Sequence, residues 1–150
     1  MKSTARIATH PIHPMLVAFP LGLWTTSFIV NVIGAVTDNF VMHQVAYYMV
    51  LAGCIGAVLA AIPGLIDLFT AVAPGTPARA TGIRHALLNV IALSFWIASL
   101  YARQGGGGMT MTAYITAAVA LAITSLGGWL GGTMVYDHYV GVPNVGEKHM

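Results

Sequence analysis

Four histidines and one aspartate lie at the borders of the apolar stretches of this sequence. They are His10, His13, Asp67, His85 and His138. Neutral imidazole is a common ligand for zinc, copper, iron and nickel, and ionisable groups beside apolar segments tend to be functional or paired. We interpret the set as a candidate cofactor or metal site. The alternative is that the histidines are hydrated side chains at a membrane surface and that Asp67 is a structural partner of a nearby arginine or histidine.

Haem b is the first cofactor that this set predicts. A membrane haem needs axial histidines, an apolar slot and cations for its propionates, and iron with two axial histidines has no open position, so its work is electron transfer. Two or more of the four histidines would be axial ligands, and two haems would be possible. Arg79 and Arg84 would hold propionates, and Asp67 would accept a hydrogen bond from a ligand imidazole. Such a protein is a redox component rather than a stand-alone enzyme.

Two other functions fit the same residues. Sets drawn from the four histidines and Asp67 could complete the four-ligand shell of a non-haem zinc, iron or copper ion, for sensing, storage or transport. The chain could also be a cofactor-free structural subunit of a membrane complex. Cys54 is the one cysteine, which excludes an intramolecular disulfide and a CxxCH haem attachment. The sequence contains no HExxH pair of a zinc protease and no catalytic residues are expected.

The composition places these residues in a membrane protein. Of 150 residues, 57% are hydrophobic and 7% are charged, and the mean hydropathy is +0.80. A soluble domain carries about 25% charged residues, so lipid must be the solvent of this chain. The formal net charge of +2 is too small to predict nucleic-acid binding.

Four continuous apolar runs are each long enough to cross the bilayer core, which takes about 20 helical residues. The predicted helices span about 14–36, 41–72, 83–101 and 109–136. Short connections force neighbouring helices to be antiparallel, so residues 1–150 are predicted to form a single all-α domain, an up-down-up-down four-helix transmembrane bundle. Pro63 should kink the second helix, and Gly105–Gly108 should form a flexible turn.

This antiparallel path gathers the four histidines at one end of the bundle. The same end carries five of the six basic residues, namely Lys2, Arg6, Arg79, Arg84 and Lys148. The opposite end carries Arg103. By the positive-inside rule, both termini and the histidines are predicted to face the cytoplasm. No cleavable signal peptide is expected, because the first apolar run is too long for one.

Glycines form a second pattern in the predicted helices. The second helix contains Gly53, Gly56 and Gly64, and the fourth contains two overlapping GxxxG repeats made by Gly127, Gly128, Gly131 and Gly132. Such positions let helix backbones approach closely, within the bundle or in a homodimer. A smooth glycine face would also let a flat macrocycle lie against a helix. Close packing is the favoured interpretation of the two.

Several motifs extend over all four predicted helices. The first two motifs are HPIHPMLV at His10–Val17 and FPLGL at Phe19–Leu23. The later motifs are Gly64–Asp67, His85–Asn89 and Gly131–Tyr136, the last continuing to His138. Together they resemble the signatures of the DUF2231 family of bacterial membrane proteins. The resemblance implies a four-helix domain in the bacterial inner (plasma) membrane. Some members look fused to Rieske-type iron–sulfur domains, which implies electron transfer and a redox partner protein.

Two positions depart from that family pattern. Many members carry histidine where this chain has Ala18, and glycine where this chain has Tyr139. The first departure removes a possible extra ligand, and the second changes the exit from the fourth helix. From the composition and the resemblance together, the expected partners are the lipid bilayer and a redox protein, with no nucleic acid.

Overall fold

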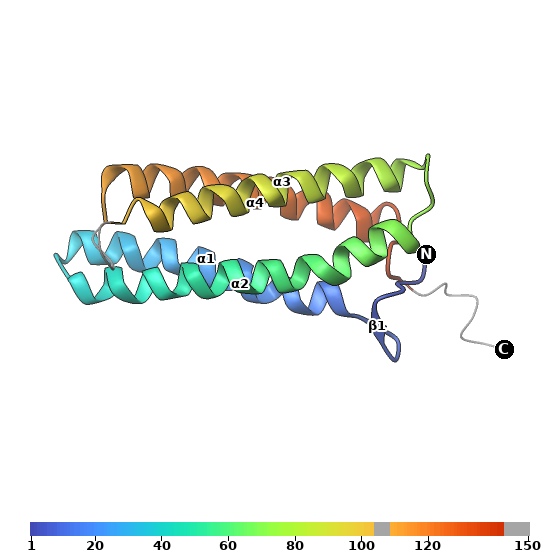
Figure 1. Ribbon diagram of the computed structural model, residues 1–150, viewed down its shortest axis with the longest axis horizontal. Coiled ribbons are helices and arrows are strands. Elements are labelled where there is room, and N and C mark those ends of the chain that lie inside the picture. Colours follow the sequence, from blue (N-terminus) through green and yellow to red (C-terminus); the bar gives the residue numbers. More distant parts are fainter. Residues whose placement is uncertain (104–108, 143–150) are drawn as a thin grey trace.

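Four long antiparallel helices make up most of the protein (Figure 1). The structure is a computed structural model that describes residues 1–103 and 109–142. The helices are α1 (Ile12–Val36), α2 (Phe40–Thr70), α3 (Pro77–Tyr101) and α4 (Met111–Tyr136), and the short strands β1 (Arg6–Ile7) and β2 (His10–Pro11) pair before α1. Each helix is long and apolar enough to cross a membrane. The predicted all-α transmembrane bundle is confirmed.

The helix starts follow capping side chains. Thr76 Oγ1 accepts a hydrogen bond from the N–H of Arg79 at 3.2 Å, and Pro77 occupies the first turn of α3. Asn39 and Thr110 cap α2 and α4 in the same way. Proline suits a first turn because its φ is already helical and its missing N–H is not needed there. The apolar pattern predicted a start at about residue 83. With this cap, α3 begins earlier, at Pro77.

Pro63 lies inside α2, which remains one helix as far as Thr70. Figure 1 shows the C-terminal part of α2 bending toward α3. Such a bend is expected where proline removes a backbone donor and crowds the preceding turn. The predicted turn at Gly105–Gly108 and the basic residue Lys148 lie outside the described residues.

The helices pair as two hairpins. α1 packs mainly on α2, and α3 packs mainly on α4, with fewer contacts between the hairpins. Trp24 and Trp96 join the two hairpins in the core, where their buried rings stack with centroids 5.3 Å apart and an interplanar angle of 13°. Trp24 Nε1 donates to the carbonyl of Val50 at 3.4 Å, and Trp96 Nε1 donates to Thr124 Oγ1 at 3.2 Å. Each indole N–H is thus satisfied inside its own hairpin.

The two hairpins repeat one arrangement of residues. Equally spaced pairs recur along the first and second hairpin, namely His13 and His85, Trp24 and Trp96, Ser27 and Ser99, and Asn31 and Arg103. The two members contact each other at the tryptophan pair and at the histidine pair. The two hairpins therefore place equally spaced residues against each other at these two points.

Large apolar side chains cover the outer faces of the bundle. Phe19, Ile55 and Val90, for example, are each more than half exposed. Extensive apolar exposure of this kind marks a membrane or interaction surface. Together with the four long apolar helices, it makes the chain a multi-pass membrane protein whose outer surface contacts lipid.

Candidate cofactor site

His13 stands in the first turn of α1 and reaches across to α2. Its Nδ1 lies 2.8 Å from the carbonyl oxygen of Ala60. The ring occupies the space that glycine leaves one helical turn farther along α2, because a Cβ at Gly64 would lie 2.7 Å from His13 Nδ1. The glycine thus forms a cradle for this imidazole.

His85 occupies the corresponding position in the second hairpin, about two turns into α3. Its Nδ1 lies 2.8 Å from the carbonyl oxygen of Gly127 in α4. Gly131, one turn farther along α4, makes room for the ring, since a Cβ there would lie 3.1 Å from His85 Cε1. Asn89 donates to the backbone carbonyl of His85 at 2.8 Å, and its amide nitrogen lies 3.3 Å from His85 Nε2.

These two hydrogen bonds place a proton on Nδ1 of both imidazole rings. A carbonyl oxygen can only accept a hydrogen bond, so Nδ1 must carry the proton in His13 and in His85. A neutral imidazole protonated at Nδ1 keeps its lone pair on Nε2. Metal-ligating histidines commonly donate their second nitrogen to a backbone carbonyl in this way. In its neutral form, each ring would therefore be the tautomer of a ligand that binds through Nε2.

The two imidazoles meet edge to face between the hairpins. Their ring centroids lie 6.1 Å apart and their planes are inclined at 89°. His13 and His85 are both half-buried. The arrangement can place two nitrogen ligands on one small group between α1 and α3, with one ligand from each hairpin.

His10 and His138 lie at the same end of the bundle but make other contacts. His10 is exposed in β2, where its Nδ1 lies 3.5 Å from Thr9 Oγ1. His138 follows α4, and its Nε2 lies 3.3 Å from Thr81 Oγ1. Of the four histidines that we singled out, the structure brings His13 and His85 into ring contact.

Asp67 holds the N-terminal segment against the end of α2. Its carboxylate accepts hydrogen bonds from Ser3 Oγ at 2.6 Å, from the N–H of Thr4 at 2.7 Å and from the N–H of Ala5 at 2.8 Å. These bonds favour the structural interpretation of Asp67 over a role as ligand or as acceptor from a ligand imidazole.

The two candidate propionate-binding arginines differ in what they contact. Arg79 caps the C-terminal end of α2, because its Nη1 donates to the carbonyls of Leu68 and Val72. Its guanidinium also lies 4.7 Å from the ring centroid of Phe69. Arg84 is exposed and directly precedes His85 in α3. Of these two arginines, Arg84 is the one whose side chain is exposed.

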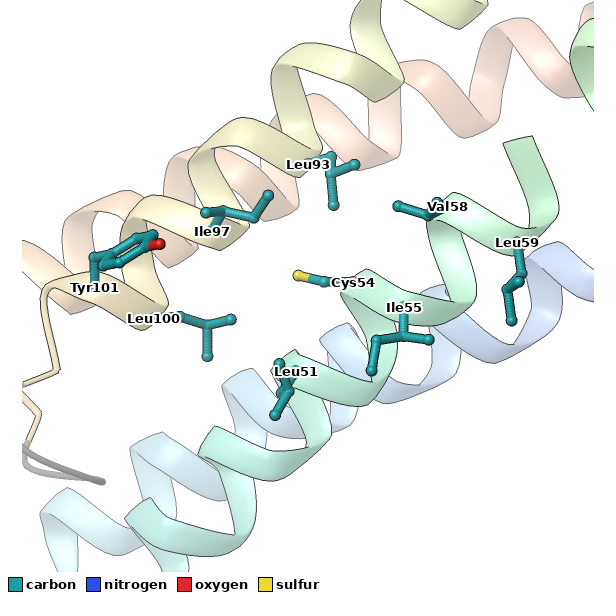
Figure 2. Close-up of a pocket in the computed structure, with 9 residues that line it drawn as sticks. All are labelled: Leu51, Cys54, Ile55, Val58, Leu59, Leu93, Ile97, Leu100 and Tyr101. Carbon is teal, nitrogen blue, oxygen red and sulfur yellow. The ribbon is translucent and has the colours of Figure 1, made fainter. Parts of the chain in front are cut away.

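An apolar groove runs between α2 and α3 (Figure 2). It has a volume of about 420 Å³ and is lined by α2 residues from Leu51 to Leu59 and α3 residues from Leu93 to Tyr101. Figure 2 shows the Cys54 thiol pointing into the space between the two helices. Leu59, a lining residue, directly precedes Ala60, whose carbonyl oxygen contacts His13.

Across residues 1–103 and 109–142, no three His, Cys, Asp or Glu side chains gather so that they could hold a metal ion together. The donor set on the described residues is thus the pair of His13 and His85. The predicted sets that add His10, His138 or Asp67 are not assembled there.

Sequence reasoning missed the groups that orient the two imidazoles. The carbonyls of Ala60 and Gly127 carry no sequence signature, because every residue has a carbonyl. The glycines one turn later were assigned to general helix packing. The spacing that His13 and Trp24 share with His85 and Trp96 is a visible signal, and it would have selected these two histidines from the four.

Comparison with known proteins adds a family to this geometry. A family model described as a predicted membrane protein, DUF2231, matches residues 9–144, which is nearly the whole chain. No curated protein and no solved structure matches the chain.

Proposed function

The chain belongs to this family of predicted membrane proteins, and from the histidine geometry we propose that it is a b-type haem protein that transfers electrons, with His13 and His85 as axial ligands. The observation that carries the proposal is the adjacent pair of imidazoles, each of which donates Nδ1–H to a backbone carbonyl and, as a neutral ring, keeps its lone pair on Nε2.

The number of ligands favours haem over a bare ion. A porphyrin supplies four nitrogen ligands of its own, so its iron needs two more from the protein, and the two hairpins offer one histidine each. A non-haem zinc, iron or copper ion usually takes three or four ligands from the protein. Two imidazoles suit the first requirement better than the second.

The spacing of the rings supports the same assignment. First-row metals bind imidazole nitrogen at roughly 2 Å, so two imidazoles that share one iron from opposite faces have centroids roughly 6 Å apart. The centroids of His13 and His85 are 6.1 Å apart. Their inclination of 89° is compatible with this binding mode, because each ring can turn about its bond to the metal.

The surroundings suit both the apolar macrocycle and the charged propionates of a haem. The groove between α2 and α3 is lined by apolar side chains, as a macrocycle requires. Arg84, exposed beside His85, is the cation that we assign to a propionate, since Arg79 is engaged at the end of α2. A haem iron with two axial histidines supplies one-electron transfer without an open substrate position. Such a function needs a redox partner protein that docks at this end of the bundle.

We place this end of the bundle at the cytoplasmic face of the bacterial inner membrane. Lys2, Arg6, Arg79 and Arg84 gather at it, and positive residues are retained on the cytoplasmic side. A green fluorescent protein fused after α4 should therefore fluoresce in cells, while alkaline phosphatase fused there should be inactive. Active alkaline phosphatase with a dark fluorescent fusion would reverse the orientation.

A visible spectrum tests the haem directly. Protein made in cells with ample haem and purified in detergent should show the sharp reduced α-band of bis-histidine haem after dithionite. A colourless protein that contains stoichiometric zinc, iron or copper would favour the bare-metal function. A colourless, metal-free protein that purifies with a larger complex would favour the structural subunit.

A further inference from the structure

A buried polar cluster lies at the end of the bundle opposite to the histidine pair. Arg103, which follows α3, is 3% exposed, and Asn31, near the end of α1, is 1% exposed. Both contact His43 in the first turn of α2. His43 Nδ1 lies 3.2 Å from Asn31 Oδ1, and Arg103 Nη1 donates to the His43 carbonyl at 3.4 Å. The side chains of Arg103 and Asn31 therefore each contact the same residue, His43.

Three donors in this cluster lack acceptors. Nε and Nη2 of Arg103 and Nδ2 of Asn31 are buried and make no hydrogen bond within the part of the chain that the structure describes. Unsatisfied buried N–H groups are strongly unfavourable, and more so when the group is charged. Their concentration in one place points to an acceptor that is not part of the described chain.

The charge of Arg103 is also uncompensated within residues 1–103 and 109–142. Burial lowers the pKa of its guanidinium, but arginine stays protonated in proteins. The acidic groups that act on it within the described residues are the phenols of Tyr114 and Tyr47, and not a carboxylate. An isolated buried cation calls for an anion as well as for hydrogen-bond acceptors.

The identity of the free atoms selects the kind of anion. Nε and Nη2 lie on the same edge of a guanidinium group, and their two parallel N–H bonds match two oxygens of a carboxylate or phosphate. The third free donor, Asn31 Nδ2, belongs to the amide whose Oδ1 contacts His43 Nδ1. A single-atom halide lacks separate acceptor atoms for the two parallel N–H bonds, whereas an oxyanion offers one oxygen to each of them and a further oxygen to an amide such as that of Asn31.

We propose that Arg103 and Asn31 form a binding site for an oxyanion of the phosphate type, held by the Nε–Nη2 edge of Arg103 and by Asn31 Nδ2. The site lies at the end of the bundle where the transmembrane helices meet the headgroup region. Free phosphate and the phosphodiester of an anionic phospholipid present the same two-oxygen face to it. The site is independent of the histidine pair, because it is formed at the other end of the helices.

The test uses the full chain in neutral detergent, with inorganic phosphate and phosphatidylglycerol as probes. Wild-type protein should gain thermal stability as phosphate rises, or should retain phosphatidylglycerol in native mass spectrometry, and these two results separate free phosphate from lipid. Arg103→Lys keeps the charge but loses the two-pronged edge, so its affinity for the effective probe should fall about tenfold or more. Arg103→Gln should abolish the response without lowering the Tm of the ligand-free protein, since it removes an unpaired buried charge.

Asn31→Asp is the second variant, because it supplies an internal carboxylate of almost unchanged shape. It should lose the response to the probe while its Tm, without ligand, equals or exceeds that of phosphate-saturated wild type. Arg84→Gln, which removes an exposed charge at the opposite end, is the matched control and should respond like wild type. A wild-type protein that responds to neither probe overturns the proposal, and so does a response that persists in Arg103→Gln or Asn31→Asp.

Discussion

Alanine in place of His13 or of His85 is expected to remove the reduced haem α-band almost completely. Each histidine supplies one of two axial ligands, and each is held by its own carbonyl, Ala60 or Gly127. Changes to groups that merely orient a ligand typically lower metal affinity about 10–100-fold. Loss of the ligand itself should therefore weaken haem binding about 100-fold or more. Titration of apo-protein with haem, followed by absorbance, measures this affinity.

The neighbouring histidines provide the controls for this prediction. His10→Ala and His138→Ala should keep the wild-type spectrum, because their side chains contact Thr9 and Thr81 instead of the adjacent pair. His85→Gln retains a donor for the Gly127 carbonyl while it removes the imidazole, so it separates ligand loss from loss of packing. An unchanged spectrum in both His13→Ala and His85→Ala would refute the proposed ligands.

The membrane bundle could be predicted because it depends on average properties of long segments. Four apolar runs, short connections and a very low charge content leave few other folds for lipid-solvated helices. The predicted start of α3 was too late, because it was derived from hydropathy, whereas the capping residues decide where this helix begins. Thr76 and Pro77 start a helix six or so residues before the chain becomes continuously apolar.

The candidate site could be predicted only as one end of the bundle. Antiparallel helices bring His10, His13, His85 and His138 to the same end, but the direction of each side chain depends on the rotation of each helix. A helix that is apolar all round carries no stripe from which that rotation can be derived. The pairing of His13 with His85 emerges from tertiary contacts, above all the cradles at Gly64 and Gly131.

Polar residues at the helix ends were harder to interpret for a related reason. Asp67 and Arg79 have the charges that a cofactor site would use, yet Asp67 accepts from backbone N–H groups of the N-terminal segment and Arg79 donates to carbonyls at the end of α2. Backbone donors and acceptors carry no residue signature, so sequence alone cannot show that they compete for these side chains. The glycines of the GxxxG pattern in α4 also differ from one another in what they contact. Gly127 and Gly131 face α3, while a Cβ at Gly128 would meet nothing within 4 Å.

The close approach of α1 to α2 leads to the second large prediction, which concerns stability. A Cβ at Gly53 would lie 2.5 Å from Nε1 and 2.7 Å from Cδ1 of Trp24. Trp24 cannot retreat, because its opposite face stacks on Trp96 and its N–H donates to Val50. Overpacking of a rigid core typically costs about 1–3 kcal/mol, occasionally more. Gly53→Ala is therefore expected to lower the free energy of unfolding by about 3 kcal/mol.

Gly22→Ala is the matched control for Gly53→Ala. Gly22 lies in α1, half a turn from Trp24, and a Cβ there would meet nothing within 4 Å. Alanine favours a helix over glycine by up to about 1 kcal/mol, so Gly22→Ala should be neutral or stabilising. Reversible unfolding in mixed detergent micelles, followed by tryptophan fluorescence, measures both variants. Equal stability of the two variants would contradict the packing of Trp24 against Gly53, because the same methyl group would then be tolerated in the core and on the lipid-facing surface.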